Sequence, residues 1–175
     1  VLVRHGESEG NVAGIINDDP TRVVSLTERG KSQAAATAHT LRTHPFTHAC
    51  SSEFPRARQT ADIILQYHSC ALYIDARLNE RMSGMDGAPV EEFNKLAGAN
   101  ILHFKPQHGE SFLEQMERIR SFLNETAHVH PRATVLALSH ENPILAAQAL
   151  IFDAPEVYAR GSIDNCQIVE LEWPL

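Results

Sequence analysis

The sequence predicts an α/β protein, a three-layer α/β/α sandwich around a mostly parallel sheet with one antiparallel edge strand. Strand-like apolar runs alternate with helical patterns along all 175 residues, which is the order that parallel strands joined by helices require. No internal repeat or low-complexity tract interrupts this alternation. The length and a hydrophobic content of 43% suffice for one buried core. We therefore expect a single domain over residues 1–175.

Five short runs have the composition of strands. They are apolar or rich in β-branched and aromatic residues, and polar or turn-forming residues bound them. The clearest is the Thr-Val-Leu-Ala-Leu-Ser run, which reads as a fully buried strand. The predicted strands span residues 1–4, 47–51, 70–74, 134–139 and 168–173.

Four segments have helical spacing and helix-start signals. The first begins at Thr27 or at Ser25, the latter forming a capping box with Glu28, and runs to about Thr43. Between the helices and strands, residues 5–25 and the stretch around Gly84, Gly87 and Pro89 are expected to be loops. The other three predicted helices open at Pro55, after the Ser111 and Glu114 capping box and up to about His130, and at Pro143, up to Phe152.

Charge and composition exclude several classes of function. A net charge of −7 and a pI near 5.8 argue against a nucleic-acid or anionic-membrane surface. No apolar run reaches the roughly 18 residues of a membrane span, and no signal-peptide pattern opens the chain. Three cysteines without a CxxC pair, and scattered histidines, indicate neither a disulfide framework nor a metal site. We expect a soluble cytoplasmic protein without metal or other cofactor.

Polar residues converge at the carboxyl ends of the predicted strands. Arg4 and His5 end the first strand, Arg56 follows the second, Glu80 the third, and His140 ends the fourth. In parallel sheets this edge binds ligands. Guanidinium and imidazole groups can stabilise the charge on a phosphoryl group in transfer, and a carboxyl group can donate a proton to the leaving oxygen. The pattern predicts phosphoryl-transfer chemistry.

Six segments in this order resemble the histidine phosphatase superfamily, the group that contains cofactor-dependent phosphoglycerate mutases, the fructose-2,6-bisphosphatase domain and small bacterial phosphatases. The resemblance covers most of the chain, and the segments are specific in combination. They are RHGESEGN at 4–11, SLTERGKSQA at 25–34, SSEFPRARQTA at 51–61, LNERMSGMDG at 78–87, GES at 109–111 and LALSHEN at 136–142.

The resemblance implies a role for each matching residue. It makes His5 the nucleophile that becomes phosphohistidine, Glu80 the proton donor, and His140 both catalytic and phosphate-binding. Arg4, Arg56 and Asn11 then complete the phosphate site. Ser8, Asn17, Arg81, Glu141 and Asn142 are candidate substrate-pocket residues.

Glu141 departs from the glycine that the family usually has after its second histidine. A carboxylate pointed into the pocket would repel a phosphate dianion by several kcal/mol per charge at an effective dielectric of about 20. We therefore expect the Glu141 side chain to point outward. Because of this departure, a second alternative stays open, in which the chain is a regulatory protein that binds phosphorylated ligands without turnover.

The favoured activity is hydrolysis of a small phosphorylated metabolite. Mutases of the family carry an insertion between the positions of Glu80 and His140 that closes over the substrate, whereas residues 81–139 leave little chain for such a lid. A site open to water hydrolyses its phosphohistidine. Because LNER at 78–81 resembles the mutase sequence, phosphoglycerate mutase-type transfer remains the alternative.

Overall fold

A five-stranded sheet lies at the centre of the molecule, in the order β3-β2-β4-β1-β5. The computed structural model describes residues 1–174. Every neighbouring pair of strands is parallel except β1 and β5, which are antiparallel at one edge. The predicted sheet is therefore confirmed, including its antiparallel edge. The strands are β1 (Leu2–Arg4), β2 (His48–Ser51), β3 (Leu72–Ile74), β4 (Val135–Ser139) and β5 (Ile168–Val169).

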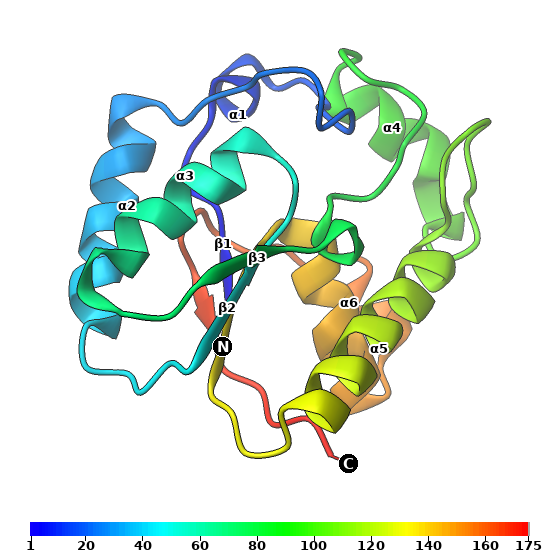
Figure 1. Cartoon of the computed structure of the whole chain (residues 1–175). Coiled ribbons are helices and arrows are strands. Elements are labelled where there is room, and N and C mark those ends of the chain that lie inside the picture. Colours follow the sequence, from blue (N-terminus) through cyan, green and yellow to red (C-terminus); the bar gives the residue numbers. More distant parts are fainter. Residues whose placement is uncertain (175) are drawn as a thin grey trace.

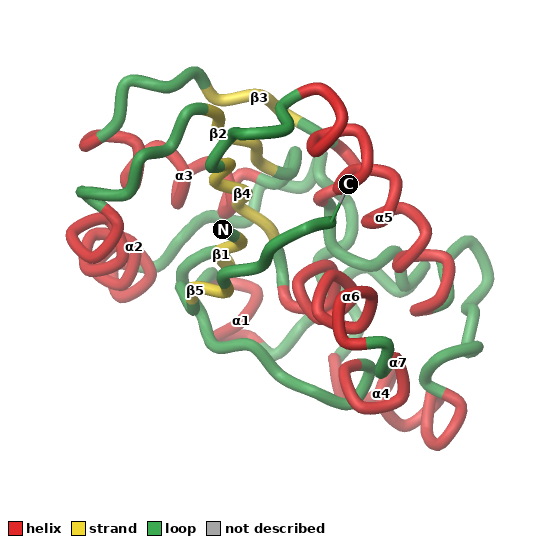
Figure 2. Tube along the Cα trace, turned by 90° about the horizontal axis from the view of Figure 1, so that it is seen from below, coloured by secondary structure: helices red, strands yellow, loops and turns green. Residues whose placement is uncertain are grey.

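Helices cover both faces of the sheet, as Figures 1 and 2 show. On one face, α2 (Glu28–Leu41) and α3 (Pro55–Ile64) pack over Val3, Ala49 and Leu136. On the other face, α5 (Phe112–Val129) and α6 (Glu141–Phe152) enclose the second half of the core. The predicted three-layer sandwich is confirmed.

The helix starts follow local capping chemistry. Thr27, not Ser25, caps α2, because its hydroxyl accepts the Gly30 N–H at 3.0 Å. The predicted capping box of Ser111 and Glu114 is present at the start of α5. Helix α6 begins at Glu141, two residues before the predicted start, because Pro143 is tolerated in a first turn, where its missing N–H leaves no helical bond unmade.

Three α-helices lie in segments without a predicted helix. Helix α1 (Glu9–Ala13) occupies the predicted 5–25 loop, and a capping box of Ser8 and Asn11 starts it. Helix α4 (Val90–Ala97) follows Pro89, and α7 (Pro155–Tyr158) follows α6. All three are short, so their apolar spacing is hard to recognise in sequence. Short 3₁₀ turns complete the structure at Leu65–Tyr67, Ala76–Leu78 and Gly98–Asn100.

Two strands are shorter than predicted. The last strand was expected to reach Trp173, but β5 ends at Val169. Because Val169 pairs with Leu2 in the antiparallel register, the residues that follow run past the beginning of β1 and have no strand to pair with. Strand β3 begins at Leu72 rather than Cys70, since β2 offers it pairing only from Ala49 to Ser51.

The carboxyl ends of the parallel strands point toward α1 and α4, at the top of Figure 1. The N-terminus lies at the opposite end of the sheet. None of the helices in residues 1–174 combines the length and the apolar character that a membrane crossing requires. The fold thus leaves the carboxyl edge of the sheet as the place where the predicted site residues can meet.

Candidate active site

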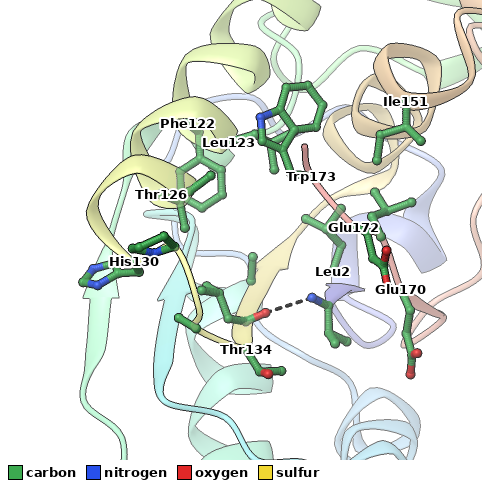
Figure 3. A pocket seen from close by; sticks show the side chains of 17 residues that line it. Leu2, Phe122, Leu123, Thr126, His130, Thr134, Ile151, Glu170, Glu172 and Trp173 are labelled. Carbon is green, nitrogen blue, oxygen red and sulfur yellow. Dashed lines mark hydrogen bonds between the residues drawn. The ribbon is translucent and has the colours of Figure 1, made fainter. Parts of the chain in front are cut away.

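Two cavities lie at opposite ends of the sheet. The larger, about 690 Å³, is shown in Figure 3 between the end of α5 and the beginnings of β1 and β4. There the backbone nitrogen of Val1 donates to the Val135 carbonyl at 2.8 Å. Among the described residues, its lining contains His130, Glu170 and Glu172 but neither arginine nor lysine. Such a lining does not attract a phosphate.

The smaller cavity, about 270 Å³, lies at the carboxyl ends of the strands. Arg4, His5, Arg56 and Glu80 all line it, so four of the five residues that the sequence analysis assigned to this edge share one pocket. His140, the fifth, is fully buried directly behind His5, with the two ring centroids 5.0 Å apart. This cavity is the candidate active site.

The imidazole of His5 is held at both nitrogens. Its Nδ1 lies 2.7 Å from the Gly6 carbonyl, and its Nε2 accepts a hydrogen bond from Arg56 Nε at 3.1 Å. A carbonyl can only accept, so Nδ1 carries the proton and the lone pair is on Nε2. Burial, with the nearby charges of Arg56 and Arg4, holds the pKa of His5 well below its usual range. The ring is therefore neutral and can act as a nucleophile.

Close backbone packing fixes the loop that carries His5. A Cβ added to Gly6 would collide with the Gly30 carbonyl oxygen, and one added to Gly30 would collide with the Glu7 carbonyl oxygen. Only glycine at both positions allows this approach of the loop to the start of α2. The Gly6 N–H also donates to Thr60 Oγ1 at 3.1 Å. The nucleophile is thus anchored to both α2 and α3.

Arg56 connects the two histidines. From the first turn of α3, its guanidinium donates to His5, to His140 Nδ1 at 3.2 Å, and to the side chain and carbonyl of Asn17. It also stacks on Phe54, 4.4 Å from the ring centroid. Burial lowers the pKa of Arg56 to about 10, and the nearby Glu80 opposes this effect. The group stays cationic at neutral pH.

His140 is oriented by a residue that the sequence analysis did not assign. Its Nε2 lies 2.7 Å from Ser52 Oγ, while its Nδ1 accepts from Arg56. An arginine can only donate, so the neutral ring carries its proton on Nε2 and donates it to Ser52. Burial and the Arg56 charge lower the pKa of His140 far below its usual range. The position of Ser52, just after β2, was the signal that could have identified it.

Glu80 has the environment of a proton donor. Burial raises its pKa, and the carboxylate of Glu141 contributes to the increase. The Arg81 N–H, which donates to Glu80 Oε1 at 2.8 Å, and the charges of Arg56 and Arg4 oppose the increase. A carboxyl group with a raised pKa retains its proton closer to neutral pH, as an acid catalyst must.

An ion pair from α5 supports the segment that carries Glu80. Arg118 pairs with Glu110 and also donates to the carbonyls of Arg77 and Asn79, at 2.6 and 3.0 Å. Glu110 in turn accepts the Met82 N–H at 3.2 Å. The backbone on both sides of Glu80 is therefore fixed, although the carboxyl group itself faces the cavity. The GES segment thus contributes a support for the proton donor.

Glu141 does not point outward, so the predicted orientation was wrong. Its carboxylate lines the cavity and pairs with Arg4, with 3.2 Å between Oε2 and Nη2. Its other oxygen accepts the Ile163 N–H at 3.2 Å. The prediction treated the arginines only as a partial offset to repulsion from a bound phosphate. It did not include a direct ion pair with Arg4 or the start of α6, both of which favour an inward carboxylate.

The other predicted pocket residues also lie at the cavity, and several of them have structural tasks. Ser8 and Asn11 cap α1, and the Asn11 side-chain oxygen also accepts from Asn165. Asn17 is buried and orients Arg56. Arg81 is buried, donates to the carbonyls of Glu110 and Phe104, and stacks on Phe93. Asn142 follows Glu141 on α6 and lines the same cavity.

Two guanidinium N–H groups in the cavity wall are buried without an acceptor among the described residues. They are Nε of Arg4 and Nη1 of Arg81. Unsatisfied buried donors are rare because each costs about 1–3 kcal/mol. In residues 1–174 no three histidine, cysteine, aspartate or glutamate side chains are grouped in a way that could hold a metal ion.

Comparison with known proteins identifies a family and several structural relatives. The model of the histidine phosphatase superfamily (branch 1) matches residues 1–174. A probable phosphoglycerate mutase GpmB of Escherichia fergusonii is 31% identical over 185 residues, covering 98% of this chain and 83% of the relative.

Two solved structures have the same fold. A mycobacterial glucosyl-3-phosphoglycerate phosphatase in complex with VO3 superposes with a TM-score of 0.84 at 24% identity, over 94% of this chain and 86% of the other. Bacillus stearothermophilus YhfR superposes with a TM-score of 0.80 at 25% identity, over 93% and 84%.

Proposed function

This chain belongs to the histidine phosphatase superfamily, and from that premise we propose that it hydrolyses small phosphomonoesters without a metal, through a phosphohistidine on His5. The arrangement that carries the proposal is the neutral His5 ring, with Nδ1 on the Gly6 carbonyl and Nε2 against Arg56. The unprotonated Nε2 is the nucleophilic atom, and the Arg56 guanidinium that donates to it is also placed to bind the phosphate once the ester enters the site.

In the first step, His5 Nε2 attacks phosphorus and the bond to the ester oxygen breaks. Arg4 and Arg56 offset the charge of the transferred group, which is the contribution a metal ion makes in other phosphatases, while the neutral His140 holds Arg56 from behind. Glu80 gives its proton to the departing oxygen. The products of this step are an alcohol, a phosphohistidine and an ionised Glu80.

In the second step, water attacks the phosphohistidine. Glu80, now ionised, takes a proton from this water, the bond between phosphorus and Nε2 breaks, and inorganic phosphate leaves. The cycle restores the neutral His5 and the protonated Glu80. Each group acts in the protonation state that its shifted pKa favours.

The experiment is an assay of purified protein with an aryl phosphate before and after treatment with EDTA. The rate of phosphate release is expected to be the same in both samples, because the guanidinium groups of Arg4 and Arg56 provide the positive charge. Loss of activity on chelation and its recovery with Mg²⁺ or Zn²⁺ would contradict the metal-independent mechanism. Binding of phosphate without any turnover would favour a regulatory protein instead.

Phosphoglycerate mutase-type transfer is the second candidate, because relatives such as the one from Escherichia fergusonii are named as probable mutases. The two activities differ in the acceptor of the phosphoryl group. Mutases carry the segment that closes over the substrate between the positions of Glu80 and His140, and helix α4, which was not predicted from the sequence, lies in that stretch. It contributes Val90 and Phe93 to one wall of the cavity. Conversion between phosphoglycerate isomers at a rate above that of phosphate release would favour the mutase.

Glu80→Gln is expected to slow the hydrolysis of alkyl phosphates by about 10²–10⁴-fold and that of aryl phosphates far less, because a phenolate leaves with little protonation. In the wild type, the rate of alkyl phosphate hydrolysis should fall as the pH rises through the raised pKa of Glu80, because Glu80 then loses the proton that it donates. Rates for both ester classes at several pH values test this. Equal losses on both would leave Glu80 with a role in binding only.

A further inference from the structure

The candidate active site is charged at its phosphate end and has a mixed lining beyond it. The charged groups gather around His5, where Arg56 donates to the ring. The remaining wall comes from the segment after α1, from α4 and from the first turns of α6. Its apolar side chains include Ile16, Phe93 and Leu145, and uncharged polar ones include Asn94 and Asn142.

Glu141 lines the same cavity as Glu80, the residue that faces the ester oxygen in the proposed mechanism. Its charge acts on Glu80. The Glu141 side chain retains 28% of its accessible surface, although it pairs with Arg4. A leaving group that extends from Glu80 into the cavity therefore shares this space with the carboxylate of Glu141.

Among the described residues, the counter-charge that Glu141 pairs with is Arg4. A phosphate dianion bound at His5 shares that guanidinium, so the charge of Glu141 is then less well balanced than in the empty site. A second negative charge on the leaving group would share the cavity with this carboxylate and be repelled by it. An uncharged leaving group avoids that repulsion.

The charge of Arg81 does not compensate for this repulsion. It is offset by Glu110, and the Arg81 guanidinium is fixed by the carbonyls of Glu110 and Phe104.

We propose that Glu141 makes this site selective for phosphomonoesters whose leaving group is uncharged, and against leaving groups that carry a carboxylate or a second phosphate. The inference rests on the proposed function, because it concerns the leaving group of that same reaction. This selectivity would distinguish the chain from enzymes that act on phosphoglycerates, because the leaving group of a phosphoglycerate carries a carboxylate.

The test compares two esters that differ in charge and little in shape, meta-carbamoylphenyl phosphate and meta-carboxyphenyl phosphate. The wild type is expected to favour the neutral ester in kcat/KM by about tenfold or more. In Glu141→Gln this preference should shrink about tenfold, because the repelling charge is gone. The ratio of kcat/KM for the two esters is compared between the wild type and Glu141→Gln, so the difference in intrinsic reactivity of the esters cancels.

Glu91→Gln is the matched control. Glu91 is exposed on α4, next to Val90, so its replacement removes a charge near the cavity but not within it. It should change the preference less than about twofold, since the charge is screened by solvent. Thermal unfolding of each variant shows whether it is folded.

Competitive inhibition by the corresponding arylphosphonates, which cannot be hydrolysed, measures the same selectivity without turnover. The neutral phosphonate should bind the wild type about tenfold more tightly than the carboxylated one. Equal binding, or a preference unchanged in Glu141→Gln, would overturn the inference. If both phosphonates bind with the expected preference but neither ester is hydrolysed, the selectivity stands and the proposed function fails.

Discussion

Replacing His5 with alanine should abolish turnover, lowering kcat at least about 10⁴-fold, because the nucleophile of both steps is then lost. His140 cannot take its place, since it is fully buried behind His5 and does not line the cavity. Steady-state phosphate release from an aryl phosphate measures the loss. The variant should still bind vanadate or phosphate, because Arg4 and Arg56 remain.

His128→Ala is the control for this prediction, because His128 is exposed on α5 and remote from the cavity. Its activity should equal that of the wild type. If His5→Ala retained more than about a tenth of the wild-type rate, the bond to phosphorus would have to form elsewhere, and the assignment of the nucleophile would be wrong.

Replacing Arg56 with methionine is expected to lower kcat/KM by about 10³-fold, or about 4 kcal/mol of transition-state stabilisation. The guanidinium offsets phosphoryl charge and also holds His5, His140 and Asn17 in place. Arg56→Lys should recover little of the loss, because one ammonium group cannot reproduce the several directed contacts of a planar fork. Activities of both variants with an aryl phosphate check this.

Arg58→Met provides a matched control on the same helix, because Arg58 is exposed and lies outside the cavity lining. It should retain full activity. Near-wild-type kcat/KM in Arg56→Lys would indicate that only the charge matters and that the contacts to the histidines do not. Thermal unfolding distinguishes lost catalysis from lost folding, since Arg56 is a buried residue.

The amino-acid pattern was sufficient to predict the sheet and the meeting of the main site residues. Buried strands are recognised from continuous apolar runs, and parallel topology places their carboxyl ends at one edge. For that reason Arg4, His5, Arg56 and Glu80 could be expected to share one pocket from their positions in the chain alone.

The supporting contacts could not be predicted, because they depend on side-chain directions across elements far apart in the chain. Ser52 and His140 are 88 positions apart, and nothing local indicates that they meet. Asn17 was assigned to the substrate pocket, yet its buried side chain accepts from Arg56. Packing geometry decides such contacts, and a single sequence does not contain it directly.

The orientation of Glu141 was missed for an electrostatic reason. Its sequence position showed that a carboxylate follows His140 but not which charge it would meet. The answer depends on Arg4, which reaches it from β1, and on the Ile163 N–H after α7. Helix α4 was missed because eight residues carry little periodic signal.

Phosphopeptide mapping of the wild type tests the central claim most directly. Protein mixed with an aryl phosphate is quenched in alkali, which preserves phosphohistidine, and its peptides are analysed by mass spectrometry. The mechanism predicts one added phosphoryl group, on His5, that forms at least as fast as steady-state turnover and disappears when substrate is exhausted. Phosphate on another residue, or hydrolysis at full rate without any phosphorylated peptide, would contradict it.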